Sequence, residues 1–173
     1  MIKLIDQIDL KVSQFILENI KNQKLDKFLS KVNRGETFFL VFLISCYLKE
    51  ISWKEFGILF IHVGFVTFLT DRFILLIKKK ISRKRPLIRV MDKKDSNPDM
   101  KHSFPSAHAA NSMISITLMI VFYQFPFYLL FFSLFAGIGR LLSLHHFLSD
   151  ITGGWLIGFL ICILNFTLFK IFF

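Results

Sequence analysis

The chain has 173 residues, the length of a single domain. Hydrophobic residues make up 54% of it, including 23 phenylalanines, which lies outside the range of soluble globular proteins. Lys and Arg number 22 against 12 Asp and Glu, which gives a formal net charge of +10. This charge would suit nucleic acid, but the long apolar runs argue against a soluble nucleic-acid binder. They favour a membrane protein that faces anionic headgroups or phosphate.

The N-terminal segment, residues 1–34, predicts amphipathic helices that lie along the membrane interface. Apolar residues such as Ile5, Ile8 and Phe15 recur among charged ones, and the pattern breaks near Asn22. Packing on the flank of a helical bundle is the alternative. The acidic residues within this segment argue against the apolar core of a cleavable signal peptide. We therefore divide the chain into this segment and a transmembrane domain, residues 35–173.

The second part predicts about five membrane-spanning helices, and hence an all-α, polytopic membrane bundle. The expected spans are residues 37–48, 56–77, 106–123, 127–142 and 151–173. A basic loop, residues 78–104, separates the second span from the third. Glycines in the last span would let a neighbouring helix approach closely. Cys46 and Cys162 fall inside apolar segments and predict neither a disulfide nor a metal site.

Five spans would place four helix ends on one membrane face: the end of the second, the start of the third, the end of the fourth and the start of the fifth. The polar residues at or near those ends are Lys78, Arg85, His108, Arg140, His146 and Asp150. A different number of spans would scatter them over both faces. The sequence therefore predicts one site, at one face, built from these residues.

Lys78 and Arg85 are seven residues apart, which puts them on one face of a helix, about 10 Å apart along its axis. Pro86 is expected to end that helix. Two long cationic side chains at this spacing could close around one phosphate. The alternative is a basic segment that flanks the membrane, because other Lys and Arg residues crowd positions 79–84.

Residues 104–108 read Phe-Pro-Ser-Ala-His and begin an apolar helix directly after the basic loop. Proline suits a first helical turn, where the free N–H groups and the helix dipole form an anion site. Ser106 adds a hydroxyl donor, and His108 is placed to donate a proton to a leaving oxygen. A helix cap is the alternative role for Ser106.

Arg140 offers a planar fork for phosphate oxygens. His146 and Asp150 are four residues apart, so on a helix their side chains would meet. A carboxylate that holds one ring nitrogen leaves the other free to attack phosphorus. His145, five residues from Asp150, is expected to point elsewhere. Zinc bound by the histidines and Asp150 is the competing interpretation, but the surrounding cations repel a metal ion and favour phosphate.

Together the three clusters resemble the motifs of the type 2 phosphatidic acid phosphatase superfamily: Lys-x6-Arg-Pro, Pro-Ser-Gly-His and Ser-Arg-x5-His-x3-Asp. The motifs cover residues 78–150, and the helical frame extends the resemblance over nearly the whole chain. Vanadium haloperoxidases share the pattern but are soluble. The chain departs from the motifs at two positions. Ala107 replaces Gly, and its methyl group narrows the approach to its N–H; Gly139 replaces Ser, which removes a hydroxyl.

The resemblance implies catalysis through a phosphohistidine, with no metal or other cofactor. His146 would be the nucleophile, and Asp150 would orient it. His108 would be the general acid and would then help to activate water. The residues that would neutralise charge on the transferring phosphoryl group are Lys78, Arg85, Ser106, Ala107 through its N–H, and Arg140.

The resemblance also implies an anionic phospholipid or lipid A as substrate, and neither nucleic acid nor a required protein partner. We expect a lipid A 1-phosphatase, because the basic loop suits a large, multiply anionic headgroup. Undecaprenyl pyrophosphate and phosphatidylglycerophosphate phosphatases are alternatives. A lipid phosphotransferase that uses the same intermediate is a second class. A non-catalytic lipid binder is a third, and the His–Asp pair counts against it.

The expected location is the bacterial inner (cytoplasmic) membrane, with the active site on the periplasmic face. The loop charge opposes this sidedness, because the positive-inside rule would place the basic 78–104 loop in the cytoplasm. We follow the family expectation, since much of that charge would serve phosphate binding.

Overall fold

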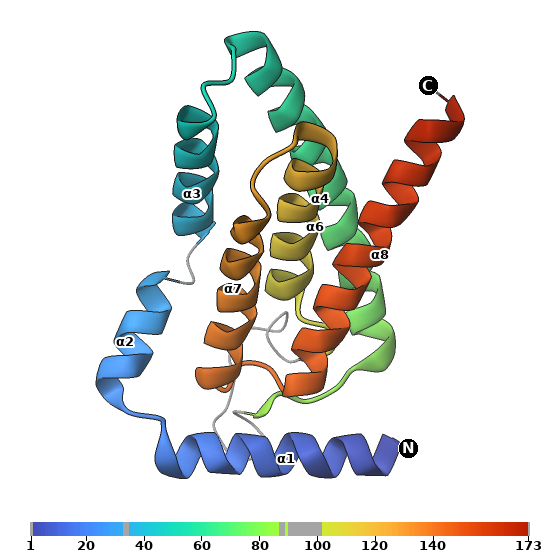
Figure 1. The fold of residues 1–173 in the computed structure, drawn as a ribbon. Helices are drawn as coiled ribbons and strands as arrows, with labels where there is room; N and C mark the ends of the chain where they lie inside the picture. The colour runs from blue at the N-terminus through green and yellow to red at the C-terminus, as the bar shows by residue number, and fades with distance from the viewer. Residues whose placement is uncertain (1, 33–34, 87–88, 90–101, 173) are drawn as a thin grey trace.

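The computed structural model describes residues 2–32, 35–86, 89 and 102–172 (Figure 1). Within these residues every regular element is a helix, apart from one isolated β-bridge between Lys84 and His102. The helices are α1 (Ile2–Asn19), α2 (Gln23–Val32), α3 (Gly35–Leu48), α4 (Trp53–Ile81), α6 (Ala107–Tyr123), the 3-10 turn η2 (Phe127–Leu129), α7 (Leu130–Leu142) and α8 (Leu148–Phe172). The predicted all-α class is therefore confirmed.

Two of these helices, α4 with 29 residues and α8 with 25, are long and apolar enough to cross a membrane. The apolar helices α3, α6 and α7 are shorter and stand alongside them in the bundle (Figure 1). Large apolar side chains cover the outside of the long helices, for example Phe65 and Phe68 on α4 and Leu164 on α8. An apolar outer surface of this extent favours lipid over water as its surroundings, so the chain is a membrane protein.

Helix α6 lies at the centre of the bundle and contacts α4, α7 and α8. Two glycines of α8 make the α6–α8 contact possible. A Cβ at Gly154 would lie 2.5 Å from the carbonyl oxygen of Ser106, and one at Gly158 would lie 2.6 Å from that of Ala110. Only glycine fits such an approach. This packing brings the first turn of α6 against the first turns of α8.

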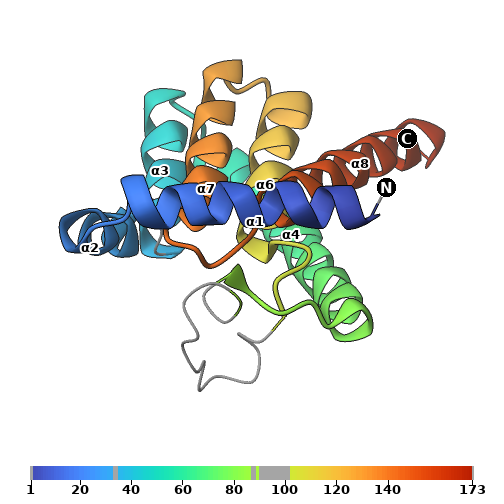
Figure 2. The same ribbon diagram turned by 90° about the horizontal axis from the view of Figure 1, so that it is seen from below.

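Helix α1 crosses the end of the bundle at which α4 and α7 end and α6 and α8 begin (Figures 1 and 2). Two polar side chains of α1, Asp9 and Ser13, are buried. Leu4, Ile8 and Phe15 are instead exposed. Exposed apolar side chains at the end of a membrane bundle are what an interfacial helix would carry, and the interfacial position of this segment stays a prediction.

Two of the helix boundaries that differ from the predicted ones bear on the site. Helix α4 ends at Ile81 and does not continue to Pro86, because Ser82 adopts a left-handed conformation (φ 51°) that closes the last turn. Arg85 therefore lies beyond the helix and not on its face. Helix α8 begins at Leu148, three residues before the predicted start at position 151, which places Asp150 in its first turn.

Candidate active site

The predicted site residues lie at the end of the bundle that α1 crosses (Figure 2). The backbone N–H of Ser106 donates to the carbonyl of Asp150 at 2.9 Å, which joins the start of α6 to the start of α8. The N–H groups of His145 and His146 donate to the carbonyl of Arg140, at 3.2 and 3.3 Å. These bonds fold the α7–α8 connection back onto α7 and bring the second and third sequence clusters together.

His146 lies in the connection between α7 and α8, not on a helix as the four-residue spacing assumed. Its side chain is 3% exposed and that of Asp150 is 0% exposed. Nδ1 of His146 is 3.7 Å from Oδ2 of Asp150, longer than a hydrogen bond, and it has no hydrogen-bond partner among the described residues. Such distances often shorten when substrate binds. The pair is adjacent, and Nδ1 is the ring nitrogen that faces the carboxylate.

Two buried apolar side chains hold this connection in place. Leu144 and Phe147 are both 0% exposed, and Leu144 adopts a left-handed φ of 57° that reverses the chain. In the same connection, Nδ1 of His145 contacts Oγ of Ser143 at 2.9 Å. The prediction that His145 points away from Asp150 is therefore confirmed.

Burial lowers the pKa of His146 to about 4. Asp150 acts in the opposite direction, while the charges of Arg85 and Lys78 lower the pKa further. His146 is therefore neutral at neutral pH. A neutral imidazole keeps the lone pair that a nucleophile needs.

Asp150 is held by two donors in addition to its contact with His146. Its Oδ1 accepts from Nη1 of Arg83 at 2.8 Å, and its Oδ2 accepts from the backbone N–H of Phe147 at 2.7 Å. The second bond joins a first-turn carboxylate to the residue before α8, which is one half of a capping box. The carboxylate is thus fixed from both sides.

Arg83 is a site residue that the sequence did not identify, because it lies among other cations between Lys78 and Pro86. Asp9, whose Oδ2 accepts from Nη2 of Arg83 at 2.7 Å, was also not identified from the sequence. The signal for Asp9 is its place between Ile8 and Leu10 in an otherwise apolar triplet. A buried carboxylate needs a cation as its partner. The sequence contains 22 Lys and Arg residues, so it does not indicate which of them pairs with Asp9.

Buried cations surround the His–Asp pair. Lys78, in the last turn of α4, is 7% exposed, and Arg85, beyond that helix, is 4% exposed. From α7, Arg140 donates to Nε2 of His108, which is exposed at the start of α6. Cations gathered at one end of the bundle concentrate positive charge there, and this arrangement suits a bound oxyanion.

Ser106 caps α6, because its Oγ accepts from the N–H of Ala109 at 3.4 Å. The alternative reading of Ser106 as a helix cap is therefore correct. Accepting that bond leaves the hydroxyl hydrogen for a second acceptor, so capping and phosphate binding are compatible. Ala107 is the first residue of the helix, where N–H groups have no partner within the helix.

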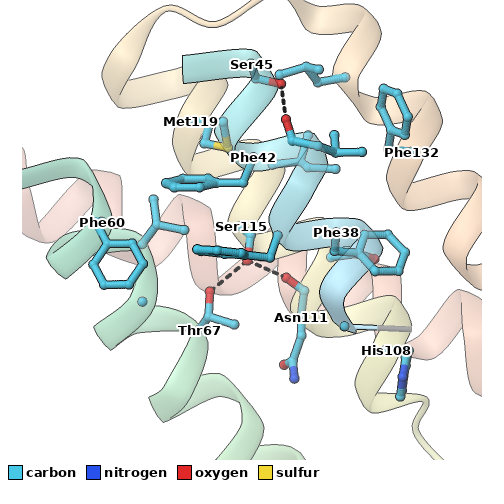
Figure 3. A pocket seen from close by; sticks show the side chains of 18 residues that line it. Phe38, Phe42, Ser45, Phe60, Thr67, His108, Asn111, Ser115, Met119 and Phe132 are labelled. Carbon is cyan, nitrogen blue, oxygen red and sulfur yellow. Dashed lines mark hydrogen bonds between the residues drawn. The ribbon is translucent and has the colours of Figure 1, made fainter. Parts of the chain in front are cut away.

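An apolar cavity of about 420 Å³ lies between α3, α4, α6 and α7 (Figure 3). Its lining is rich in large apolar side chains, among them Phe42, Phe60 and Met119. His108 lies at one end, and Ser45 lies near the opposite end (Figure 3). The volume is typical of a small-molecule site. The cavity therefore runs from the predicted active site into the apolar part of the bundle.

No group of three His, Cys, Asp or Glu side chains within the described residues could hold a metal ion. Most of the basic loop, including its acidic residues at positions 92, 95 and 99, lies outside the described residues.

The apolar helical bundle is that of a membrane protein, and its buried cations, buried His–Asp pair and adjoining apolar cavity form a candidate site for an oxyanion such as phosphate. The chain belongs to the PAP2 superfamily, whose members are phosphatases; the family model matches residues 59–172.

Two solved structures share the fold. The crystal structure of Aquifex aeolicus LpxE has a TM-score of 0.66 and 22% sequence identity, over 91% of this chain and 94% of that one. The crystal structure of a transmembrane PAP2 type phosphatidylglycerolphosphate phosphatase from Bacillus subtilis has a TM-score of 0.69 and 16% sequence identity, over 98% of this chain and 88% of that one. No curated protein matches the sequence.

Proposed function

We propose that this protein is a metal-independent lipid phosphatase that removes a phosphate from a lipid headgroup through a phosphohistidine at His146. One observation carries the proposal: the buried His146 lies against Asp150, among buried cations, and burial lowers its pKa. A hydrolase needs this nucleophile, whereas a protein that only binds anionic lipids does not. Membership in a superfamily of phosphatases supports the same reaction.

In the first step, Nε2 of His146 attacks phosphorus, and the bond from phosphorus to the leaving oxygen breaks. His108, protonated when the substrate is bound, donates its proton to that oxygen, and Arg140 then donates to the phosphate in place of Nε2 of His108. In the second step, water attacks phosphorus as the N–P bond breaks, and His108 accepts the proton of the water. Inorganic phosphate leaves, and both histidines return to their starting states. Asp150 holds the Nδ1 side of His146 during both steps.

The remaining site residues stabilise the charge of the phosphoryl group. Lys78, Arg85 and Arg140 are cations that can reach its oxygens from three segments of the chain. Ser106 and Ala107 add a hydroxyl and a backbone N–H at the start of α6. These donors supply positive charge around phosphorus without a metal ion.

The apolar cavity supports a lipid substrate. A phosphate bound near His108 would lie at its end, so one hydrocarbon chain of the substrate can enter between α3 and α4. Lipid A is our first candidate, and undecaprenyl pyrophosphate and phosphatidylglycerophosphate are the alternatives. The likeness in fold to a phosphatidylglycerolphosphate phosphatase keeps that lipid among the candidates. Transfer of the phosphoryl group to another lipid is the second candidate reaction, since it uses the same intermediate.

We further propose that the protein lies in the bacterial inner membrane with its site on the periplasmic face. Two of the cations at this end, Arg83 and Arg89, are paired with Asp6, Asp9 or Asp150. Acidic partners count little in the positive-inside rule, so the proposed sidedness rests on the family expectation and on the phosphate-binding role proposed for Lys78 and Arg85.

The test is the release of inorganic phosphate by the purified full-length protein in detergent. The substrates are lipid A, undecaprenyl pyrophosphate and phosphatidylglycerophosphate, each assayed with and without a chelator. We expect release that the chelator does not reduce, and the preferred lipid identifies the substrate. Labelled phosphate that appears on an acceptor lipid would indicate transfer instead. No release and no transfer with any lipid would refute the proposal.

Filling the cavity is expected to weaken binding of the lipid chain. Gly64 lines the cavity, and a Cβ there would meet no atom within 4 Å. In Gly64→Leu, the new side chain should displace about two methylene groups of substrate at about 0.8 kcal/mol each, raising KM for a long-chain lipid about tenfold. The measurement compares KM for that lipid with KM for p-nitrophenyl phosphate, which has no chain and should be unaffected.

The matched control is Gly57→Leu, on the same helix. Gly57 has equally open surroundings but does not line the cavity. If both variants raise KM for the lipid equally, or neither does, the cavity does not hold the chain.

A further inference from the structure

A single guanidinium, that of Arg83, joins α1 to the first turn of α8. Its Nη1 donates to Oδ1 of Asp150 at 2.8 Å and to Oγ of Ser149 at 2.7 Å. Its Nη2 donates to Oδ2 of Asp9 at 2.7 Å and to Oδ1 of Asp6 at 3.2 Å. Arg83 thus contacts three carboxylates from two helices that lie far apart in the sequence.

The surroundings of Arg83 keep it charged and in place. Asp9 and Asp150 are 1% and 0% exposed, and buried carboxylates are costly without a counter-charge. Burial works against the charge of Arg83, but the hydrogen bonds and charges of Asp9 and Asp150 raise its pKa above the ordinary value. The guanidinium also lies over the ring of Phe147, 4.3 Å from the centroid.

Asp9 makes a second connection to α8, through Ser149. The backbone N–H of Ser149 donates to Oδ1 of Asp9 at 3.0 Å, and its hydroxyl donates to Oδ2. First-turn N–H groups have no partner within their own helix, so a carboxylate from α1 serves as a cap for α8. Helix α1 therefore holds both Arg83 and the turn that carries Asp150.

We propose that Arg83, held by Asp9, is a positioning residue that sets the direction of the Asp150 carboxylate toward His146. Oδ1 of Asp150 is occupied by Arg83, which leaves Oδ2 to face the N–H of Phe147 and Nδ1 of His146. Without Arg83 the carboxylate stays close to His146 with its charge no longer countered, but it is not held in the one orientation that fixes the neutral imidazole. The inference rests on the proposed function for the role of His146.

The first measurement is steady-state kinetics of the full-length Arg83→Gln variant in detergent, with the lipid that the wild-type protein hydrolyses best. We expect kcat to fall roughly 10- to 100-fold, with KM within about twofold of wild type, because the proposed phosphate-binding side chains are unchanged. Arg83→Lys keeps the charge but lacks the planar fork, so its kcat should be intermediate.

Arg89→Gln is the matched control. Arg89 donates to both oxygens of Asp6, at 2.6 and 2.9 Å, so it belongs to the same charge network. It also lies over Phe147, with 5.6 Å to the centroid. Among the contacts of the described residues, none joins it to Asp150. Its removal should therefore leave kcat within about twofold of wild type.

The second measurement needs no substrate. Three charged groups act on His146: Lys78 of α4, Asp150 of α8, and Arg85, which lies beyond α4. Asp150 is in turn paired with Arg83. Without Arg83, the negative charge of Asp150 acts on His146 alone and should raise the pKa of His146 by about one unit. Titration of ¹⁵N-histidine-labelled protein in detergent micelles by NMR measures this shift, with Arg89→Gln again as control.

Unchanged kcat together with an unchanged titration of His146 in Arg83→Gln would overturn the inference. If the wild-type protein hydrolyses no lipid, the proposed function fails, and the titration alone decides the role of Arg83. If Arg83→Gln does not fold, Arg83→Lys and Asp9→Asn take its place. A kcat that equals wild type in both would likewise overturn it, whereas Arg83→Lys keeps the charge and need not shift the titration.

Discussion

Replacing His146 by alanine is expected to abolish phosphate release. The variant has no atom that can form the bond to phosphorus, and removal of a catalytic nucleophile costs roughly 10⁴-fold or more in kcat. The measurement is phosphate release from the preferred lipid, at enzyme concentrations high enough to detect the small activity that would remain after such a loss. Brief incubation with ³²P-labelled lipid should also give an acid-labile label on the wild-type protein and none on the variant.

His145→Ala is the matched control, because it removes the neighbouring imidazole. The ring of His145 contacts Ser143 and not Asp150. Its loss should leave kcat within a few-fold of wild type, with label still formed. Activity that survives in His146→Ala, or label that is lost in His145→Ala and kept in His146→Ala, would contradict the proposed mechanism.

Hydropathy predicted the helices of the bundle well, because apolar length is a local property of the sequence. The third span, predicted as 106–123, differs from α6 by one residue at its start. The end of α4 was placed wrongly, because Pro86 looked like the stronger stop signal. The helix ends at Ile81, where the left-handed Ser82 also donates its hydroxyl to the carbonyl of Lys79 at 2.8 Å. The residue at which a helix is capped in this way is difficult to predict from sequence alone.

The spacing of the motifs predicted that Lys78, His108, Arg140 and the His–Asp pair share one end of the bundle, because alternation of spans places their helix ends there. What it could not supply were the contacts between elements far apart in sequence. Asp9 and Asp150 share Arg83 across 141 positions of chain. Such a pairing depends on how α1 lies across the bundle, which local patterns do not determine.

Replacing Asp150 by asparagine is expected to lower kcat roughly 10³- to 10⁴-fold, although the side chain keeps its shape. The carboxylate accepts from two sides, from Arg83 at Oδ1 and from the N–H of Phe147 at Oδ2. An amide has one oxygen, so either orientation sets its NH₂ group against a donor. The amide therefore cannot hold the position of Oδ2 beside His146 and satisfy both donors.

The pH dependence separates this variant from a general loss of structure. The proposed nucleophile must be neutral, so the rate falls as pH drops through the pKa of His146. Asp150 raises that pKa against the effect of burial, and its neutralisation should lower the pKa further. The acid limb of the kcat/KM profile should then move to lower pH, opposite in sign to the change expected for Arg83→Gln.

Asp71→Asn is the matched control for Asp150→Asn. Asp71 is also a carboxylate of a long apolar helix, paired with Arg72 at 2.7 Å and bonded to Asn111 at 3.0 Å, and among the contacts of the described residues none joins it to His146. Its neutralisation should leave both kcat and the acid limb near wild type. An Asp150→Asn variant that matched Asp71→Asn in both measurements would show that His146 does not depend on the carboxylate. Catalysis by this site would then need a different source of orientation for the imidazole.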